Sequence, residues 1–177
     1  MGAFFYDDAD RSKLLVLYFV NSLNIDLTRD QIAYFSTVHD LMPYFDLQTT
    51  VGELEADGYL AAVPRPYGHA FLLTDMGRET LAMFKNRIPI PVQDTLDKYA
   101  DECRDDMLRQ TQSLSTFELA GPDGSYTVNF KVIEDNRTLL GLELLLPDSG
   151  SVNRSLSRWK EKSADIYQYI IKQLAEE

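Results

Sequence analysis

The sequence is poor in cysteine and histidine, the side chains that most often carry metal or nucleophilic chemistry. Cys103 is the only cysteine in 177 residues, so the chain can form no intrachain disulfide and no thiolate-rich metal site. The two histidines, His39 and His69, fit no spacing of a metal site or a catalytic triad. We therefore expect no enzyme activity, no metal and no cofactor.

Basic residues are also scarce. The chain has 17 Lys and Arg against 28 Asp and Glu, a formal net charge of −11. This balance argues against broad non-specific binding to nucleic acid or anionic membranes, although a small basic patch stays open. No run approaches the roughly 20 apolar residues of a membrane span. The start, MGAFFYDDAD, lacks a signal-peptide pattern. We expect a cytoplasmic protein with no membrane partner.

Helical signals dominate the first third of the chain. Residues 11–23 predict a helix that is apolar around most of its circumference. Thr28 is an N-cap candidate for a second helix, and Gln31 completes a capping box. A third helix is expected from about Leu47, after a linker in which Pro43 ends any helix. Its apolar side is formed by Leu47, Val51 and Leu54, at the spacing i, i+4 and i+7. Gly58 suits the end of this helix.

A hairpin and a fourth helix follow the third helix. YLAAV and HAFLL read as strands around the turn PRPYG, and Thr74 or Asp75 caps a helix with Met76, Leu81 and Phe84 inward. This order is that of a winged helix-turn-helix. The phrase LEADGYL…LLTDMGRETL resembles bacterial regulators of the MarR and PadR types. The resemblance implies a winged helix-turn-helix domain over residues 1–88.

The remainder predicts a long helix and then a small sheet. Val92, Leu96, Tyr99 and Cys103 form a helical stripe, so residues 89–112 are expected to connect two domains or to lie along a second subunit. Residues 113–177 predict a three-stranded antiparallel sheet covered by a C-terminal helix. A first loop, GPDG, sets Leu119 opposite Tyr126 and Phe117 opposite Val128.

The second turn of this sheet has two candidate lengths. A two-residue turn sets Val128 opposite Glu143, whereas a three-residue turn, 134–136, sets Val128 opposite Leu142 and Phe130 opposite Leu140. The longer turn keeps one side of the sheet apolar, so we predict it. The fold class is therefore α+β.

The whole chain resembles a bacterial family known only as a domain of unknown function, which joins a winged helix to a small α+β domain. NRIP, YTVNFKVIEDNRTLLGLEL and W…YQYI carry this resemblance. It implies a fold and no activity.

A DNA-binding function would place six residues at the interface. Gln48, Thr49 and Thr50 begin the third helix and would meet base edges. Arg29 would contact the backbone, Arg65 would enter the minor groove and His69 would touch a phosphate. Residues 1–90 nevertheless carry seven bases and twelve acids, and 7 − 12 leaves −5.

Two functions from different classes therefore remain. One is a DNA-binding transcriptional regulator, dimeric through the first helix and the helix that begins near Val92. The other is an adaptor whose acidic winged helix binds a protein partner and no DNA. In the C-terminal half, Tyr126, Phe130 and Trp159 either line an effector pocket or form the core between sheet and helix.

Overall fold

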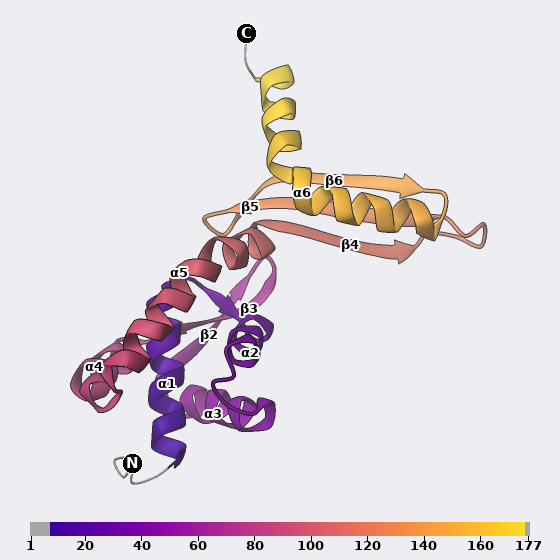
Figure 1. The fold of residues 1–177 in the computed structure, drawn as a ribbon. Helices are drawn as coiled ribbons and strands as arrows, with labels where there is room; N and C mark the ends of the chain where they lie inside the picture. The colour runs from indigo at the N-terminus through magenta and orange to yellow at the C-terminus, as the bar shows by residue number, and fades with distance from the viewer. Residues whose placement is uncertain (1–7, 176–177) are drawn as a thin grey trace. The chain divides into compact units, whose positions relative to one another are not determined.

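The computed structural model describes residues 8–175, so part of the N-terminal pattern used against a signal peptide lies outside the described residues. The described chain has six α-helices and two three-stranded antiparallel sheets, which confirms the α+β class. It divides into two units, residues 1–107 and 108–177 (Figure 1). None of the described helices is long and apolar enough to cross a membrane.

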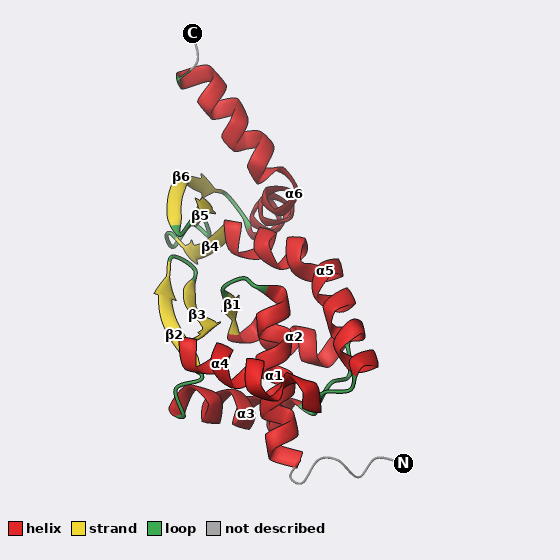
Figure 2. Cartoon of the chain, turned by 90° about the vertical axis from the view of Figure 1, so that its left-hand side faces the viewer, coloured by secondary structure: helices red, strands yellow, loops and turns green. Residues whose placement is uncertain are grey.

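The first unit contains five α-helices, the last of which continues past its boundary, and one sheet. In chain order its elements are α1 (Asp8–Leu23), β1 (Leu27–Thr28), α2 (Arg29–Val38), α3 (Tyr44–Ala56), β2 (Leu60–Arg65), β3 (Gly68–Leu73), α4 (Asp75–Phe84), a 3-10 turn η1 (Lys85–Arg87) and α5 (Ile90–Gln112). The sheet has the order β1-β3-β2, and β2 and β3 form a hairpin around the two residues 66 and 67 (Figure 2).

The helix starts show one prediction confirmed and one wrong. Thr28 accepts a hydrogen bond from the Gln31 N–H, and the Gln31 side chain accepts one from the Thr28 N–H, so the capping box is present. Pro43, however, precedes α3 instead of ending a helix. Its φ of −57° already suits a helix start, and α3 begins at Tyr44, three residues before the predicted Leu47.

The stretch LEADGYL…LLTDMGRETL joins three elements at one point. Gly58 has a φ of +79°, which turns the chain out of α3. The Thr74 hydroxyl donates to the Gly58 carbonyl (2.7 Å) and accepts from the Gly77 N–H (3.0 Å), so it also caps α4. A Cβ on Gly77 would lie 2.2 Å from the carbonyl oxygen of Tyr59, the residue before β2, so α4 comes this close to the chain there only because residue 77 is glycine.

Apolar side chains of α1, α2, α3 and α5 share one core. In α1 every residue from Leu14 to Val20 is buried, as the apolar circumference predicted. The stripe on α5 packs against the same core, with Leu96 and Met107 fully buried. These two surfaces motivated the expected dimer, and both are covered within one chain. Met76, predicted inward on α4, is instead 44% exposed.

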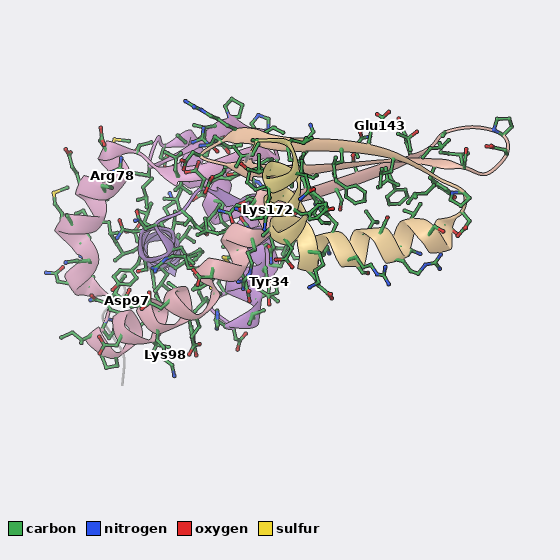
Figure 3. All side chains as sticks on the ribbon, turned by 90° about the horizontal axis from the view of Figure 1, so that it is seen from above. Tyr34, Arg78, Asp97, Lys98, Glu143 and Lys172 are labelled. Carbon is green, nitrogen blue, oxygen red and sulfur yellow. The ribbon has the colours of Figure 1, made fainter. Side chains whose placement is uncertain are left out.

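Polar contacts fix α5 against α1 and α2. The Asp97 carboxylate accepts hydrogen bonds from Tyr18 (3.0 Å) and Ser22 (2.6 Å), whereas the neighbouring Lys98 points away (Figure 3). Arg104 donates to the last carbonyls of α1, at Ser22 (2.7 Å) and Leu23 (2.9 Å). α1 has no basic residue in its last turn, so Arg104 supplies the positive charge that a helix C-terminus favours.

The second unit is a meander backed by one helix. Its elements are the end of α5, β4 (Ser113–Leu119), β5 (Tyr126–Glu134), β6 (Arg137–Leu146) and α6 (Ser149–Leu174). Leu119 lies opposite Tyr126 and Phe117 opposite Val128, as predicted. Val152 and Trp159 of α6 are buried against the central strand.

The predicted second turn of this sheet is wrong. The turn has two residues, Asp135 and Asn136, both with positive φ. A bulge follows, because Val132 pairs with Leu140 while Ile133 pairs with Thr138. The extra residue restores the apolar side that a two-residue turn alone would lose. Val128 therefore lies opposite Leu144 and Phe130 opposite Leu142, two residues from the predicted partners.

We predict that two substitutions separate the roles of Gln31. Its Nε2 donates to the Met107 carbonyl (2.7 Å) at a buried position. Gln31→Glu keeps the capping box but places a carboxylate against that carbonyl, so it should destabilise the first unit by about 2–3 kcal/mol. Thr28→Ala removes only the cap and should cost about 1 kcal/mol.

Urea unfolding followed by far-UV circular dichroism measures both changes. The single tryptophan, Trp159, belongs to the second unit, so its fluorescence transition serves as the internal control and should not move. A Gln31→Glu protein as stable as wild type would show that the bond to Met107 contributes nothing.

Candidate functional site

The six candidate contact residues lie on α2, on α3 and on the neighbouring β2–β3 hairpin. Thr49 is exposed, and its hydroxyl donates to the Phe45 carbonyl (3.0 Å). Gln48 is half-buried. Thr50 is only 6% exposed and belongs to the inward side of α3, so its predicted place at base edges is wrong. The reason is the helical period: Thr50 follows Leu47 by three residues and precedes Leu54 by four, so it shares the buried side of α3 with them.

The Arg29 side chain links α2 to α3 and β3, because its guanidinium contacts residues of both elements. Its guanidinium donates to Gln48 Oε1 (3.1 Å) and approaches a carboxylate oxygen of Glu55 (3.4 Å). The same group lies 4.9 Å from the centroid of the Phe71 ring. Two of the candidate residues, Arg29 and Gln48, therefore bind each other in this structure.

The two candidate residues of the hairpin, Arg65 and His69, have different surroundings. Arg65 lies beside Asp26 in the loop before β1, with 2.5 Å between Nε and Oδ2. Both side chains are about one-quarter exposed. His69 is exposed opposite Pro64 at the hairpin end. Arg65 thus ties the hairpin to the α1–β1 loop, and a contact with DNA would have to compete with Asp26.

The acids of α3 have cations from other elements beside them. Lys13 of α1 lies 3.0 Å from Glu53 and 3.1 Å from Asp57. Hydrogen bonds to Glu53 and then to Asp57 raise the pKa of Lys13, which keeps it charged. Glu55 lies beside Arg29. Three of the four acids between Asp46 and Asp57 are therefore compensated locally.

Two exposed aromatic residues begin α3. Phe45 is 82% exposed and Tyr44 is 55% exposed, with their rings 5.8 Å apart at a steep angle. The sequence interpretation missed them because it assigned these residues to a linker. The signal that would have found them is Pro43, whose fixed φ is suited to the first turn of a helix.

Gly52 leaves the middle of α3 without a side chain. A Cβ there would meet no atom within 4 Å, and its φ is not positive, so neither packing nor backbone geometry requires glycine. Glycine in a helix interior costs about 1 kcal/mol relative to alanine. Gly52 therefore leaves the α3 backbone without a side chain one turn after exposed Thr49.

The residues considered for other chemistry lie apart or in the core. No group of three His, Cys, Asp or Glu within residues 8–175 is arranged to hold a metal ion. His39 stacks on Tyr99, with ring centroids 3.7 Å apart, and burial lowers its pKa. Burial raises the pKa of the Cys103 thiol, which lies on the half-buried stripe of α5.

The expected effector residues form the core of the second unit. Phe130 and Trp159 are each 3% exposed, and their ring centroids lie 4.9 Å apart. Tyr126 packs against the same cluster and against the Phe117 ring. The indole N–H of Trp159 is buried without an acceptor among the described residues. These contacts favour the core interpretation over the pocket.

The chain is thus an α+β protein of two units. It belongs to the family described as a domain of unknown function, DUF4364, whose model matches residues 12–174. This confirms the expected membership of an uncharacterised family. No curated protein and no solved structure matches the chain.

We predict opposite effects of alanine at two glycines. Gly52→Ala should stabilise the first unit by about 0.5–1 kcal/mol, because the methyl group meets open space and the helix gains propensity. Gly77→Ala should destabilise it by roughly 1–3 kcal/mol, because its Cβ would overlap the Tyr59 carbonyl. Thermal melts by circular dichroism compare the two, and a destabilised Gly52→Ala protein would contradict the open environment.

Proposed function

We propose that the first unit is a winged helix-turn-helix and that the protein is a DNA-binding transcriptional regulator without enzymatic activity. The order α1-β1-α2-α3-β2-β3-α4 and the sheet order β1-β3-β2 support the winged-helix assignment. In such a domain α3 is the recognition helix and the β2–β3 hairpin is the wing. The proposal extends to a cytoplasmic location, where a regulator meets DNA.

The outward side of α3 carries this proposal. Gln48 can bond adenine with its amide, and the methyl group of Thr49 can contact thymine. Gly52 then allows the backbone of α3 to come close to the groove floor, which a larger residue would prevent. Gly52 follows Gln48 by four residues and Thr49 by three, so Gly52 shares a side of α3 with each of them.

Electrostatics set the expected strength of binding. Phosphate neutralisation supplies most non-specific affinity, and residues 1–90 have a balance of −5. Lys13 and Arg29 offset the acids near the far end of α3, which reduces repulsion but also occupies two cations. We therefore expect weak non-specific affinity and binding that depends on sequence contacts and on low salt.

The binding experiment uses the full-length protein and genomic fragments. Fragments that the protein retains at about 50 mM salt are sequenced, and the enriched site is then used in mobility-shift titrations. Gly52→Ala should weaken binding to this site while raising the melting temperature, a combination that a purely structural role cannot produce. If no fragment is retained at about 50 mM salt, the regulator proposal fails.

Glu53→Gln tests whether α3 approaches the phosphates. Glu53 is about half exposed and lies on the α3 surface. Removing its charge should strengthen binding about two- to fivefold at low salt, because one repulsive interaction is lost and Lys13 keeps only Asp57 as a partner. Glu79→Gln on α4 is the matched control and should change little. Equal effects of the two substitutions would place the DNA away from α3.

The second candidate function is a protein-binding adaptor, and the exposed Tyr44–Phe45 pair favours it. Exposed aromatic residues are typical anchors of protein interfaces. A photo-reactive phenylalanine analogue at Phe45 separates the two functions in cells. A DNA-binding regulator should give adducts with DNA, and an adaptor should give adducts with protein. The same analogue at Glu79 should give neither kind of adduct in comparable yield.

A further inference from the structure

The later part of α6 leaves the sheet that its first part covers. Val152 and Trp159 are buried, but no residue from 160 to 174 is. Figures 1 and 2 both show α6 changing direction, so that its last turns, which carry Lys172 in Figure 3, run away from β4, β5 and β6. Ile166 of this segment packs against the core of the second unit, but its last turns are without buried residues, and a helix of this length is marginal in water alone.

This part of α6 has a continuous apolar stripe. Its members follow the spacing i, i+1, i+4, i+5 and i+8, which puts them on one side, and none is charged (Ile166, Tyr167, Ile170, Ile171, Leu174). Leu174 is 82% exposed. We call this surface the α6 stripe. Asp165 and Lys172 lie on the opposite side of the helix.

The side of the sheet that α6 faces also has exposed apolar residues. Phe117, Leu119 and Leu144 share the side of the sheet that α6 faces, because they are in register with Val128 and Tyr126. They are nevertheless 53%, 63% and 44% exposed. We call these three residues the sheet flank. Ile166 of the stripe still packs against the sheet core, and the rest of the stripe is half-buried or exposed. The second unit thus has a partly covered helix surface and a partly covered sheet surface.

We propose that a second copy of this chain covers both surfaces, with the α6 stripe of each copy packed on the sheet flank of the other. A two-fold arrangement uses each surface twice, as a closed homodimer requires. Neither surface carries charge, so two chains of −11 can meet there without direct repulsion.

The size of the two surfaces also suits a dimer. A large apolar side chain has about 200 Å² of surface. At their exposures, the α6 stripe and the sheet flank together expose on the order of 600 Å² of apolar area in each copy. A standard interface needs roughly 800 Å² from each partner. Polar atoms around the two surfaces can supply the difference. The inference is independent of the proposed function, since it involves only the second unit.

Three variants of the full chain test this interface by size-exclusion chromatography with light scattering. The wild type should have the mass of two chains at about 100 μM. Ile170→Glu puts a charge in the stripe, and Phe117→Lys puts one in the flank. Each should weaken dimerisation at least tenfold, because an isolated charge is costly in an apolar interface. Gln168→Glu adds the same charge as Ile170→Glu on another side of α6 and should leave the dimer intact.

Mixing tests whether the stripe meets the flank. An equimolar mixture of the Ile170→Glu and Phe117→Lys proteins should form dimers again. Each heterodimer would contain one wild-type contact and one Glu–Lys contact. Circular dichroism confirms that both variants are folded. A monomeric wild type, a dimer that survives either substitution, or a mixture that stays monomeric would each overturn the proposal.

Discussion

One buried amide, the side chain of Gln31, connects the start of α2 to α5 in the first unit. The Gln31 carbonyl oxygen accepts from the Thr28 N–H, which starts α2, and its amide nitrogen donates to Met107 near the end of α5. A buried amide that loses a partner costs about 1–3 kcal/mol, so both bonds select one position of α5 along α2. That position brings Asp97 to Tyr18, whose pKa burial and the Asp97 hydrogen bond raise to about 12. It also brings Arg104 to the end of α1.

The fixed position of α5 determines which surfaces of the first unit stay exposed. Because α5 is fixed on α1 and α2, the apolar sides of α1 and α5 are buried together inside one chain. The apolar stripe of α5, which the sequence alone suggests is available for a partner, is therefore part of the core of the first unit. The surfaces that keep apolar or open character are the start and middle of α3 in the first unit, and the α6 stripe and sheet flank in the second.

Sequence reasoning succeeded where a signal is satisfied within a few residues. The Thr28–Gln31 box, the positive φ of Gly58 and the Thr74 cap each depend on neighbours close in the chain. It failed where a distant partner decides. The Val132–Ile133 bulge keeps the sheet side apolar by a route that turn length alone does not reveal. For the candidate site, Thr49 is exposed and Gln48 is half-buried on α3, and spacing could not show that Arg29 and Arg65 lie beside Glu55 and Asp26.

The acidity of α3 has a structural explanation that precedes any function. Glu55 and Asp57 lie at its C-terminal end, where the helix dipole disfavours negative charge, and its last turn contains no base. Lys13 and Arg29 supply the missing positive charge from α1 and α2, and in doing so connect three helices. These half-exposed pairs are each worth at most about 1 kcal/mol, so phosphates can compete for either cation. Glu55 and Asp57 lie at the C-terminal end of α3, away from Gln48 and Thr49, so their charge is compatible with the proposed DNA contact at the start of this helix. Glu53, nearer the middle of α3, is the acid whose charge bears most directly on that compatibility.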